Sequence, residues 1–230
     1  MDINNIFFFL LALCLQIVSA APSALSALNI KRSPDPLPNN ALTSAFLGSS
    51  APIFYRGPRE NFPAMDTWMS FGDMFNVNTA SMVAAGSTWD DVGRMRVAIQ
   101  DAAAAFGVDE RVILGIIMEE STGYVGVITT WNVDGQATAG LMQASGCPGY
   151  PGQTNLPQAD ISSMVNCGTQ HYQQNLQHWS NLGPAQAVYP ALREYNSGSV
   201  DINDLSVAPN GAGNSFYVSD ISQRFQGWTN

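Results

Sequence analysis

Two consecutive helical patterns between Thr88 and Glu120 constrain the fold more than any other feature of the chain. Thr88 is a favourable N-cap, two aspartates occupy the first turn, and Gly107 is a typical helix terminator. Between them, apolar residues recur at helical spacings of three and four: Val92, Met95, Ile99, Ala102 and Phe106. Asp109 is expected to cap a second helix that continues to Glu120.

Weaker patterns surround this pair. Two more helices are expected at residues 160–179 and 184–195, and a short amphipathic helix with its exit at 65–75. Residues 124–157 are rich in Gly, Thr and Pro, which indicates loops and a short hairpin. The sequence therefore predicts a mainly α domain of the α+β kind, with one irregular excursion in its middle.

The N-terminal residues 1–20 have the features of a secretory signal peptide. An apolar run, Ile6 to Leu13, precedes small residues that end at Ala20, although the segment before the run carries Asp2 and no basic residue. The run is too short for a bilayer, which needs about 20 apolar residues. We therefore expect a secreted, extracellular protein with no membrane anchor after cleavage.

A second cleavage is expected after the dibasic pair Lys31-Arg32, which would make residues 21–32 a propeptide typical of eukaryotic secretion. The alternative is that the pair is two solvated charges in a loop. Residues 33–63 are rich in Pro, Ser, Asn and Gly and are expected to form a linker or surface arm. The domain itself would then span residues 64–230.

Charge and composition exclude several classes of protein. With 46% hydrophobic and 12% charged residues, the chain is typical of a globular domain and not of a disordered one. Its formal net charge of -9 argues against nucleic acid and anionic membranes as partners. Loss of residues 1–32 would remove Asp2, Lys31 and Arg32, so the mature net charge would be -10.

The cysteines fit an oxidising compartment. Cys14 would leave with the signal peptide, and the remaining two, Cys147 and Cys167, most simply form a disulfide. Two cysteines with two distant histidines, His171 and His178, lack the spacing of a zinc site. We expect no metal and no cofactor.

Glu120 is the candidate for chemistry. The residues that share its helix face are apolar: Val112, Ile113, Ile116 and Ile117. A carboxyl at the edge of an apolar wall loses hydration in its charged form, which raises its pKa and makes it a proton donor near neutral pH. Glu119 points about 100° away and is expected to be solvated. Alternatively, both glutamates are simply exposed acids in the last turn.

Three motifs in order extend this interpretation. A helix that contains Val108-Asp109-Glu110 ends in Glu120-Ser121, and Gly140-Leu141-Met142-Gln143 follows twenty residues after the glutamate. The third motif is Glu194-Tyr195-Asn196-Ser197-Gly198. Together they resemble the lysozyme-like superfamily, specifically the soluble lytic transglycosylase and goose-type lysozyme group. That group usually has Ala where this chain has Glu194.

The resemblance implies a lysozyme-like fold with a glycan-binding cleft and roles for particular residues. Glu120 would be the general acid that protonates the bridging oxygen, and Ser121 would orient the loop after the helix. Tyr195 would place its hydroxyl near Glu120, and Asn196 would contact sugar or backbone. The floor of the cleft would be the second motif, Gly140, Leu141, Met142 and Gln143. For Leu141 a place in the core is the stronger alternative.

Asp134 is the candidate for a second carboxylate. It lies six residues before the motif glycine, where goose-type members carry an acid, whereas Ser145 occupies their other acidic position. The resemblance thus favours water attack with inversion, for which base and acid lie roughly 6.5–9.5 Å apart. The neighbours Asn132 and Gly135 also permit a turn-forming role for Asp134.

Trp131 is the best candidate to stack on a sugar ring, ahead of four other aromatic residues: Tyr124, Tyr150, Tyr172 and Trp179. The resemblance implies an antibacterial muramidase that cleaves the β-1,4 bond between N-acetylmuramic acid and N-acetylglucosamine. Alternatives are a lytic transglycosylase, a chitin hydrolase, which would avoid repulsion from an anionic wall, and a non-catalytic glycan-binding effector. The expected partner is peptidoglycan or another N-acetylglucosamine-containing glycan. The oligomeric state is not indicated, and a monomer is assumed.

Overall fold

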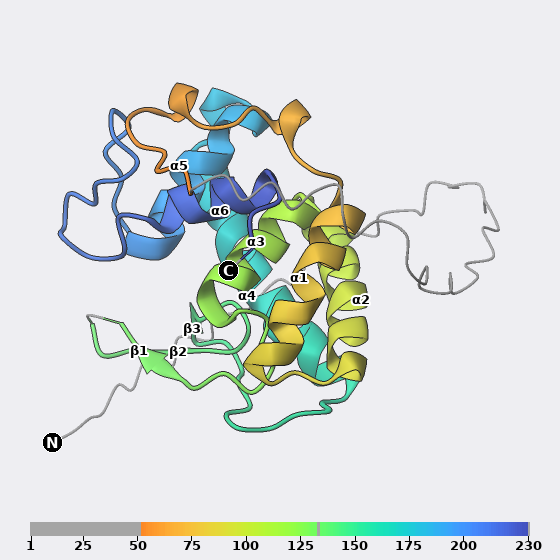
Figure 1. Ribbon diagram of the computed structural model, residues 1–230. Helices are drawn as coiled ribbons and strands as arrows, with labels where there is room; N and C mark the ends of the chain where they lie inside the picture. Colours follow the sequence, from red (N-terminus) through yellow and green to blue (C-terminus); the bar gives the residue numbers. More distant parts are fainter. Residues whose placement is uncertain (1–51, 133, 230) are drawn as a thin grey trace, which may run out of the picture. The chain divides into compact units, whose positions relative to one another are not determined.

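The computed structural model describes residues 52–132 and 134–229. The expected signal peptide (1–20) and propeptide (21–32) lie outside the described residues, as does the first part of the expected linker, 33–51. The described part is mainly helical, as predicted (Figure 1). Its α-helices are α1 Phe71–Ala85, α2 Trp89–Phe106, α3 Glu110–Ser121, α4 Gln158–His178, α5 Pro184–Ser197 and α6 Tyr217–Phe225.

The predicted irregular excursion contains a small antiparallel sheet. Its strands, in spatial order, are β1 Thr130–Trp131, β2 Ala137–Ala139 and β3 Ala144–Ser145. Thr130 pairs with Thr138 across β1 and β2, and Ala139 pairs with Ala144 across β2 and β3. Short 3-10 turns complete the secondary structure: η1 Arg59–Asn61, η2 Met65–Thr67 and η3 Ser180–Leu182.

Helix α3 is the centre of the core. It packs against α1 and α2 on one side and against α6 on another (Figure 1). The predicted stripe is buried, but Leu114, Gly115 and Met118 are buried too, so the helix is enclosed on nearly all sides. A Cβ atom at Gly115 would lie 2.8 Å from Cγ2 of Ile221, so the close approach of α3 and α6 requires glycine there.

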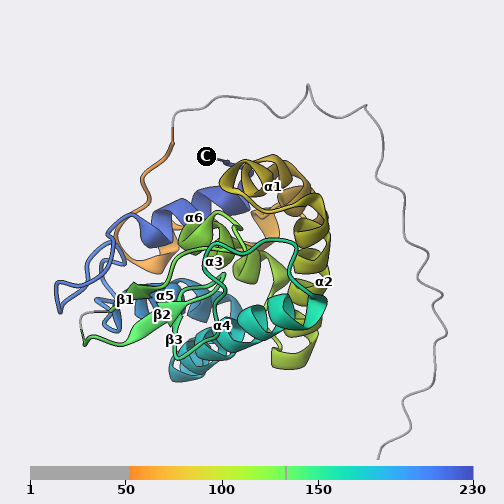
Figure 2. The same ribbon diagram turned by 90° about the horizontal axis from the view of Figure 1, so that it is seen from below.

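The two helices predicted before Glu120 are confirmed, together with the capping and terminating residues that predicted them. Thr88 and Asp91 form a capping box at the start of α2, and Gly107 ends it in the left-handed conformation. Asp109 caps α3 by accepting a hydrogen bond from the backbone N–H of Arg111. The helices expected at 160–179 and 184–195 are α4 and α5; α4 packs on α2 and α5 (Figure 2).

Helices α1 and α6 differ from the sequence prediction. The expected helix at 65–75 is only the 3-10 turn Met65–Thr67, and α1 begins after Ser70 and continues to Ala85. The Ser70 hydroxyl accepts from the backbone N–H of Asp73, a local cap that hydrophobic periodicity does not reveal. No helix was predicted at α6, which is short, lacks a side-chain cap and buries several polar residues.

Residues 52–63, within the segment predicted as a linker or surface arm, make specific contacts with the helices. The backbone N–H of Ile53 donates to Gln223 (2.7 Å), and that of Tyr55 donates to Ser219 (2.9 Å), both on α6. Phe62 is buried, with its ring centroid 4.9 Å from that of Tyr189. This part of the chain therefore contributes to the core.

The Cys147–Cys167 disulfide is present, as predicted, and joins the loop after β3 to α4, with Cα atoms 5.7 Å apart. Within the described ranges, no helix is long and apolar enough to cross a membrane.

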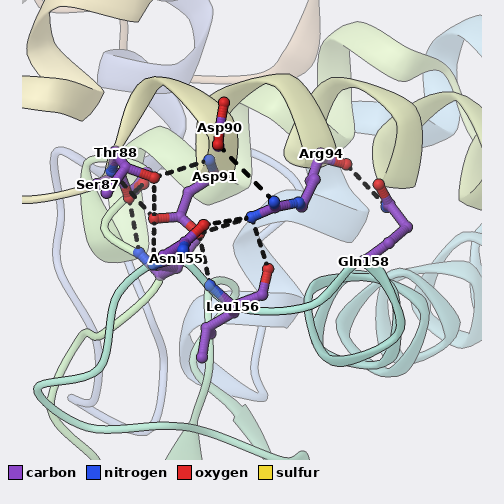
Figure 3. A network of polar contacts seen from close by, with 10 residues as sticks. Ser87, Thr88, Asp90, Asp91, Arg94, Asn155, Leu156 and Gln158 are labelled. Atoms are coloured by element: carbon purple, nitrogen blue, oxygen red, sulfur yellow. Dashed lines mark hydrogen bonds and ion pairs between the residues drawn. The ribbon is translucent and has the colours of Figure 1, made fainter.

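Asp91 connects α2 to the loop that leads into α4 (Figure 3). Its carboxylate is fully buried and accepts hydrogen bonds from the backbone N–H groups of Asn155 and Leu156 (2.8 Å each) and of Thr88 (3.0 Å). Burial by itself would raise the pKa of Asp91, but these hydrogen bonds outweigh it and hold the pKa below its ordinary value. The folded state therefore favours the charged carboxylate.

We expect Asp91→Ala to lower the free energy of unfolding by about 3 kcal/mol, because buried N–H groups lose their charged acceptor. Asp90→Ala is the matched control, since its side chain is 77% exposed and lies 3.9 Å from Arg94. That control should change stability by less than about 1 kcal/mol. Urea unfolding near neutral pH measures both, and equal losses would contradict the anchoring role of Asp91.

Candidate active site

Glu120 lies in the last turn of α3, partly exposed, while Ile116 and Ile117 before it are completely buried. Burial raises the pKa of its carboxyl from 4.5 to about 7. The nearby hydroxyl of Tyr217 opposes this rise, and the negative charge of Glu119 adds to it. The carboxyl can thus hold or release a proton near neutral pH.

Glu119 is not solvated, so that expectation is wrong. Its carboxylate lies 3.5 Å from the guanidinium of Arg224 on α6, and the two side chains are only 13% and 2% exposed. The prediction failed because it assumed a solvent-facing side for α3, whereas α6 covers that side. Adjacent glutamates therefore have different environments: Glu119 has a cationic partner and Glu120 has none among the ion pairs of the described residues.

Two tyrosines lie near the Glu120 carboxyl. The hydroxyl of Tyr217, on α6, is buried without a partner in ordinary hydrogen-bond geometry, yet it lies close enough to lower the pKa of Glu120. Burial raises the pKa of Tyr195, on α5, and the charge of Glu120 raises it further. The resemblance implied Tyr195 at this position, whereas Tyr217 was not predicted, because α6 itself was not recognised.

Hydrogen bonds join the three sequence motifs around Glu120. The Ser121 hydroxyl lies 2.8 Å from the carbonyl oxygen of Leu141 and 2.9 Å from that of Ile117. The Tyr195 hydroxyl donates to the carbonyl of Met142 (2.8 Å). The end of α3, the second motif and α5 are thereby held together. Ser121 is buried and has no histidine among its hydrogen-bond partners, an arrangement that does not resemble an activated nucleophile.

The second motif is built mainly from buried residues. A Cβ atom at Gly140 would lie 2.4 Å from the carbonyl oxygen of Pro148, so glycine is required by protein packing. Leu141 and Met142 are 0% and 1% exposed, and their side chains belong to the core. Protein packing alone therefore explains why residue 140 is a glycine, and close approach of a glycan to the backbone is not needed as a reason. Any sugar contact at 141–142 would involve the main chain.

Gln143 has a left-handed backbone conformation, with φ 45°, and a side chain engaged within the protein. Its amide nitrogen donates to the carbonyls of Gly140 (3.0 Å) and Ile128 (3.2 Å), and its amide oxygen accepts from Thr130 (2.8 Å). These bonds fasten the sheet region to the second motif. Direct recognition of a ligand by this amide would require an exchange of partners.

Asn196 also has protein partners. Its side-chain oxygen accepts from the backbone N–H of Asn214 (2.7 Å) and from the guanidinium of Arg193. The residue therefore connects α5 to the loop that precedes α6.

Asp134 and Trp131 lie in the β1–β2 hairpin. Asp134 is exposed in the turn, and its backbone N–H donates to the side chain of Asn132 (3.1 Å). The side chain that accepts the hydrogen bond within the turn thus belongs to Asn132, and the carboxylate of Asp134 faces solvent. Trp131 is 69% exposed, as stacking on a sugar would require.

The other aromatic candidates differ in access. Tyr172 is completely buried in the core and is unavailable to a ligand. Tyr124 and Tyr150 are partly exposed. Trp179 is partly buried against the core, and its indole N–H donates to Glu194 (2.7 Å), which also lies 2.8 Å from Nδ1 of His178. Glu194, which stands where the lysozyme-like group usually has Ala, thus joins α5 to the end of α4.

The only potential metal-ligand cluster among the described residues contains Cys147, Cys167 and His171. Because the two sulfurs are bonded to each other, neither can act as a thiolate ligand. A surface depression of about 380 Å³ lies at the start of α3, lined by residues that include Asp109 and Arg111. It is at the opposite end of that helix from Glu120.

No protein-family model and no curated protein matches this chain.

Replacement of Glu120 should stabilise the protein. Burial raises the pKa of Glu120 above 4.5, so ionising this carboxyl costs more free energy in the folded state than in the unfolded state. This loss of stability is absent below the pKa of the unfolded state and complete above about pH 7. Glu120→Gln should raise the free energy of unfolding by about 2–3 kcal/mol at pH 8 and have little effect at pH 4. Urea unfolding at the two pH values tests this, and a pH-independent difference would contradict the raised pKa.

Proposed function

We propose that this chain is a secreted muramidase that cleaves the β-1,4 bond between N-acetylmuramic acid and N-acetylglucosamine in bacterial peptidoglycan. The observation that carries the proposal is the Glu120 carboxyl, whose pKa is raised to about 7 by burial at the end of α3. Glycoside hydrolysis needs a carboxylic acid that is still protonated at the working pH and can donate to the leaving oxygen.

The joining of the three motifs supports the same function. Ser121 contacts the carbonyl of a residue 20 positions away, and Tyr195 contacts one 53 positions away. Residues that resemble the lytic transglycosylase and goose-type lysozyme group thus surround one carboxyl, and a lysozyme-like fold with a glycan cleft beside Glu120 is part of the proposal. Tyr217 would stabilise the carboxylate that remains after proton donation, because its hydroxyl lowers the pKa of Glu120.

Secretion is supported by the disulfide and by the signal-like N-terminal sequence. The expected role is antibacterial degradation of cell walls. No cofactor takes part in the proposed reaction, in which water is the second substrate.

We expect Glu120→Gln to reduce the clearing of bacterial cell-wall suspensions by about 10²–10⁴-fold, because the general acid is lost. Glu60→Gln is the matched control, since it makes the same change at a side chain that is 63% exposed. Turbidity loss with purified peptidoglycan measures the rate for both variants. Unchanged clearing by Glu120→Gln would refute the role of Glu120, and a wild-type protein that binds walls without clearing them would favour a non-catalytic effector.

The role of Asp134 separates a hydrolase from a lytic transglycosylase. Its exposure leaves the carboxylate free to act as a base on water, although its place in a turn does not require that role. A transglycosylase needs no second carboxylate, because the 6-hydroxyl of the sugar closes an anhydro ring.

We expect water-added products from the wild type and, for Asp134→Asn, a rate lower by about 10²-fold or more if Asp134 is the base. Mass spectrometry of digested peptidoglycan identifies the product ends, and Asp101→Asn is a control at another exposed aspartate. Exclusively anhydro ends would contradict the base role. Parallel digestion of chitin tests the uncharged substrate that the acidic net charge also permits.

A further inference from the structure

Arg193, on α5, is a cation with no anionic partner among the described residues. Its side chain is 0% exposed, and none of the ion pairs of the described residues includes it. The adjacent acid, Glu194, is directed to His178 and Trp179. Burial lowers the pKa of Arg193, and the only charge effect that opposes this comes from Tyr217.

The guanidinium is only partly satisfied by hydrogen bonds. Its Nη1 donates to the carbonyl of Asn214 (2.9 Å), and its Nη2 donates to the side-chain oxygen of Asn196. Its Nε is buried and has no partner. Buried charges in proteins are normally paired, since isolated ones are costly, so an unpaired guanidinium with a free donor is unusual.

Arg193 is among the residues that line a pocket of about 160 Å³. Besides Arg193, its lining comes from the loop between α5 and α6: Ser206, Ala208, Gly211, Ala212, Gly213 and Ser215. No carboxylate belongs to the lining, and the acid nearest in sequence to the loop part of the lining, Asp204, accepts from the hydroxyl of Ser206. Small and hydroxyl-bearing residues beside a cation leave room for an oxyanion and can donate to it.

We propose that Arg193 and the loop at 206–215 form a binding site for a small oxyanion, a carboxylate or a phosphate. The planar guanidinium suits either group, because Nε and an Nη can donate side by side to two oxygens. Bound anion would supply the countercharge that Arg193 lacks. This site is separate from the proposed acid catalysis and does not depend on it.

The anion could be free in solution or could be part of a glycan. The second source is relevant because Asn196 contacts Arg193 and Tyr217 lies near both Arg193 and Glu120. N-acetylmuramic acid carries a lactyl carboxylate that N-acetylglucosamine lacks, so this pair of sugars separates the two sources.

The experiment is isothermal titration of the mature protein with sodium phosphate, at constant ionic strength set by chloride. We expect saturable binding with one site per chain, weakened about tenfold or more in Arg193→Met. Separate titrations with N-acetylmuramic acid and with N-acetylglucosamine then show whether the anion comes from a glycan or from solution. Binding of the first sugar alone indicates a glycan carboxylate, and binding of phosphate with neither sugar indicates a free anion; both support the site.

A second variant keeps the test independent of the stability of Arg193→Met. Ala208→Leu fills the pocket while the guanidinium remains, and it should also abolish phosphate binding. Arg56→Met and Ala84→Leu are the matched controls at exposed positions and should bind as the wild type does. The proposal is overturned if phosphate and both sugars fail to bind the wild type, or if Ala208→Leu binds phosphate unchanged.

Discussion

Helix α3 is buried on nearly all sides, and the other helices are arranged around it. The helix packs against α1, α2 and α6, and its close approach to α6 requires Gly115. Side chains in the last turn of an enclosed helix are therefore surrounded by protein of low polarity. Here the helix ends in two glutamates, so the core that stabilises the fold also determines the chemistry of Glu119 and Glu120.

The two glutamates meet this constraint in different ways. Glu119 has Arg224 as an ionic partner, which opposes the effect of burial on its pKa. Glu120 has no cationic partner among the ion pairs of the described residues, and burial, with a further contribution from the charge of Glu119, raises its pKa to about 7. A carboxyl held in this way destabilises the folded protein at alkaline pH, and such a cost is typical of groups retained for function. The contrast between neighbours argues that Glu120 is not simply a surface acid.

Polar contacts carry the long-range organisation around this core. Asp91 holds the loop before α4, Ser121 and Tyr195 hold the second motif, and Asn196 holds the loop before α6. Several residues that the sequence suggests as ligand contacts thus have partners within the protein. Their effect on a ligand would be exerted through the shape of the site, whereas Glu120, Trp131 and Asp134 remain accessible.

Helices with local signals were predictable from the sequence, because caps and helical periodicity act over a few residues. The capping box at Thr88, the stop at Gly107 and the cap at Asp109 predicted α2 and α3 correctly, and two remaining cysteines predicted the disulfide. The groups that cover the end of α3, in contrast, come from a distant part of the chain and are brought there by tertiary packing. Helix α6 has a buried apolar face, Tyr217, Val218, Ile221 and Phe225, but it is only nine residues long and has no side-chain cap, so it was not predicted, and Tyr217 and Arg224 were not placed from the sequence. Their contacts with α3 cross about 100 residues of chain, a distance over which no local pattern gives information.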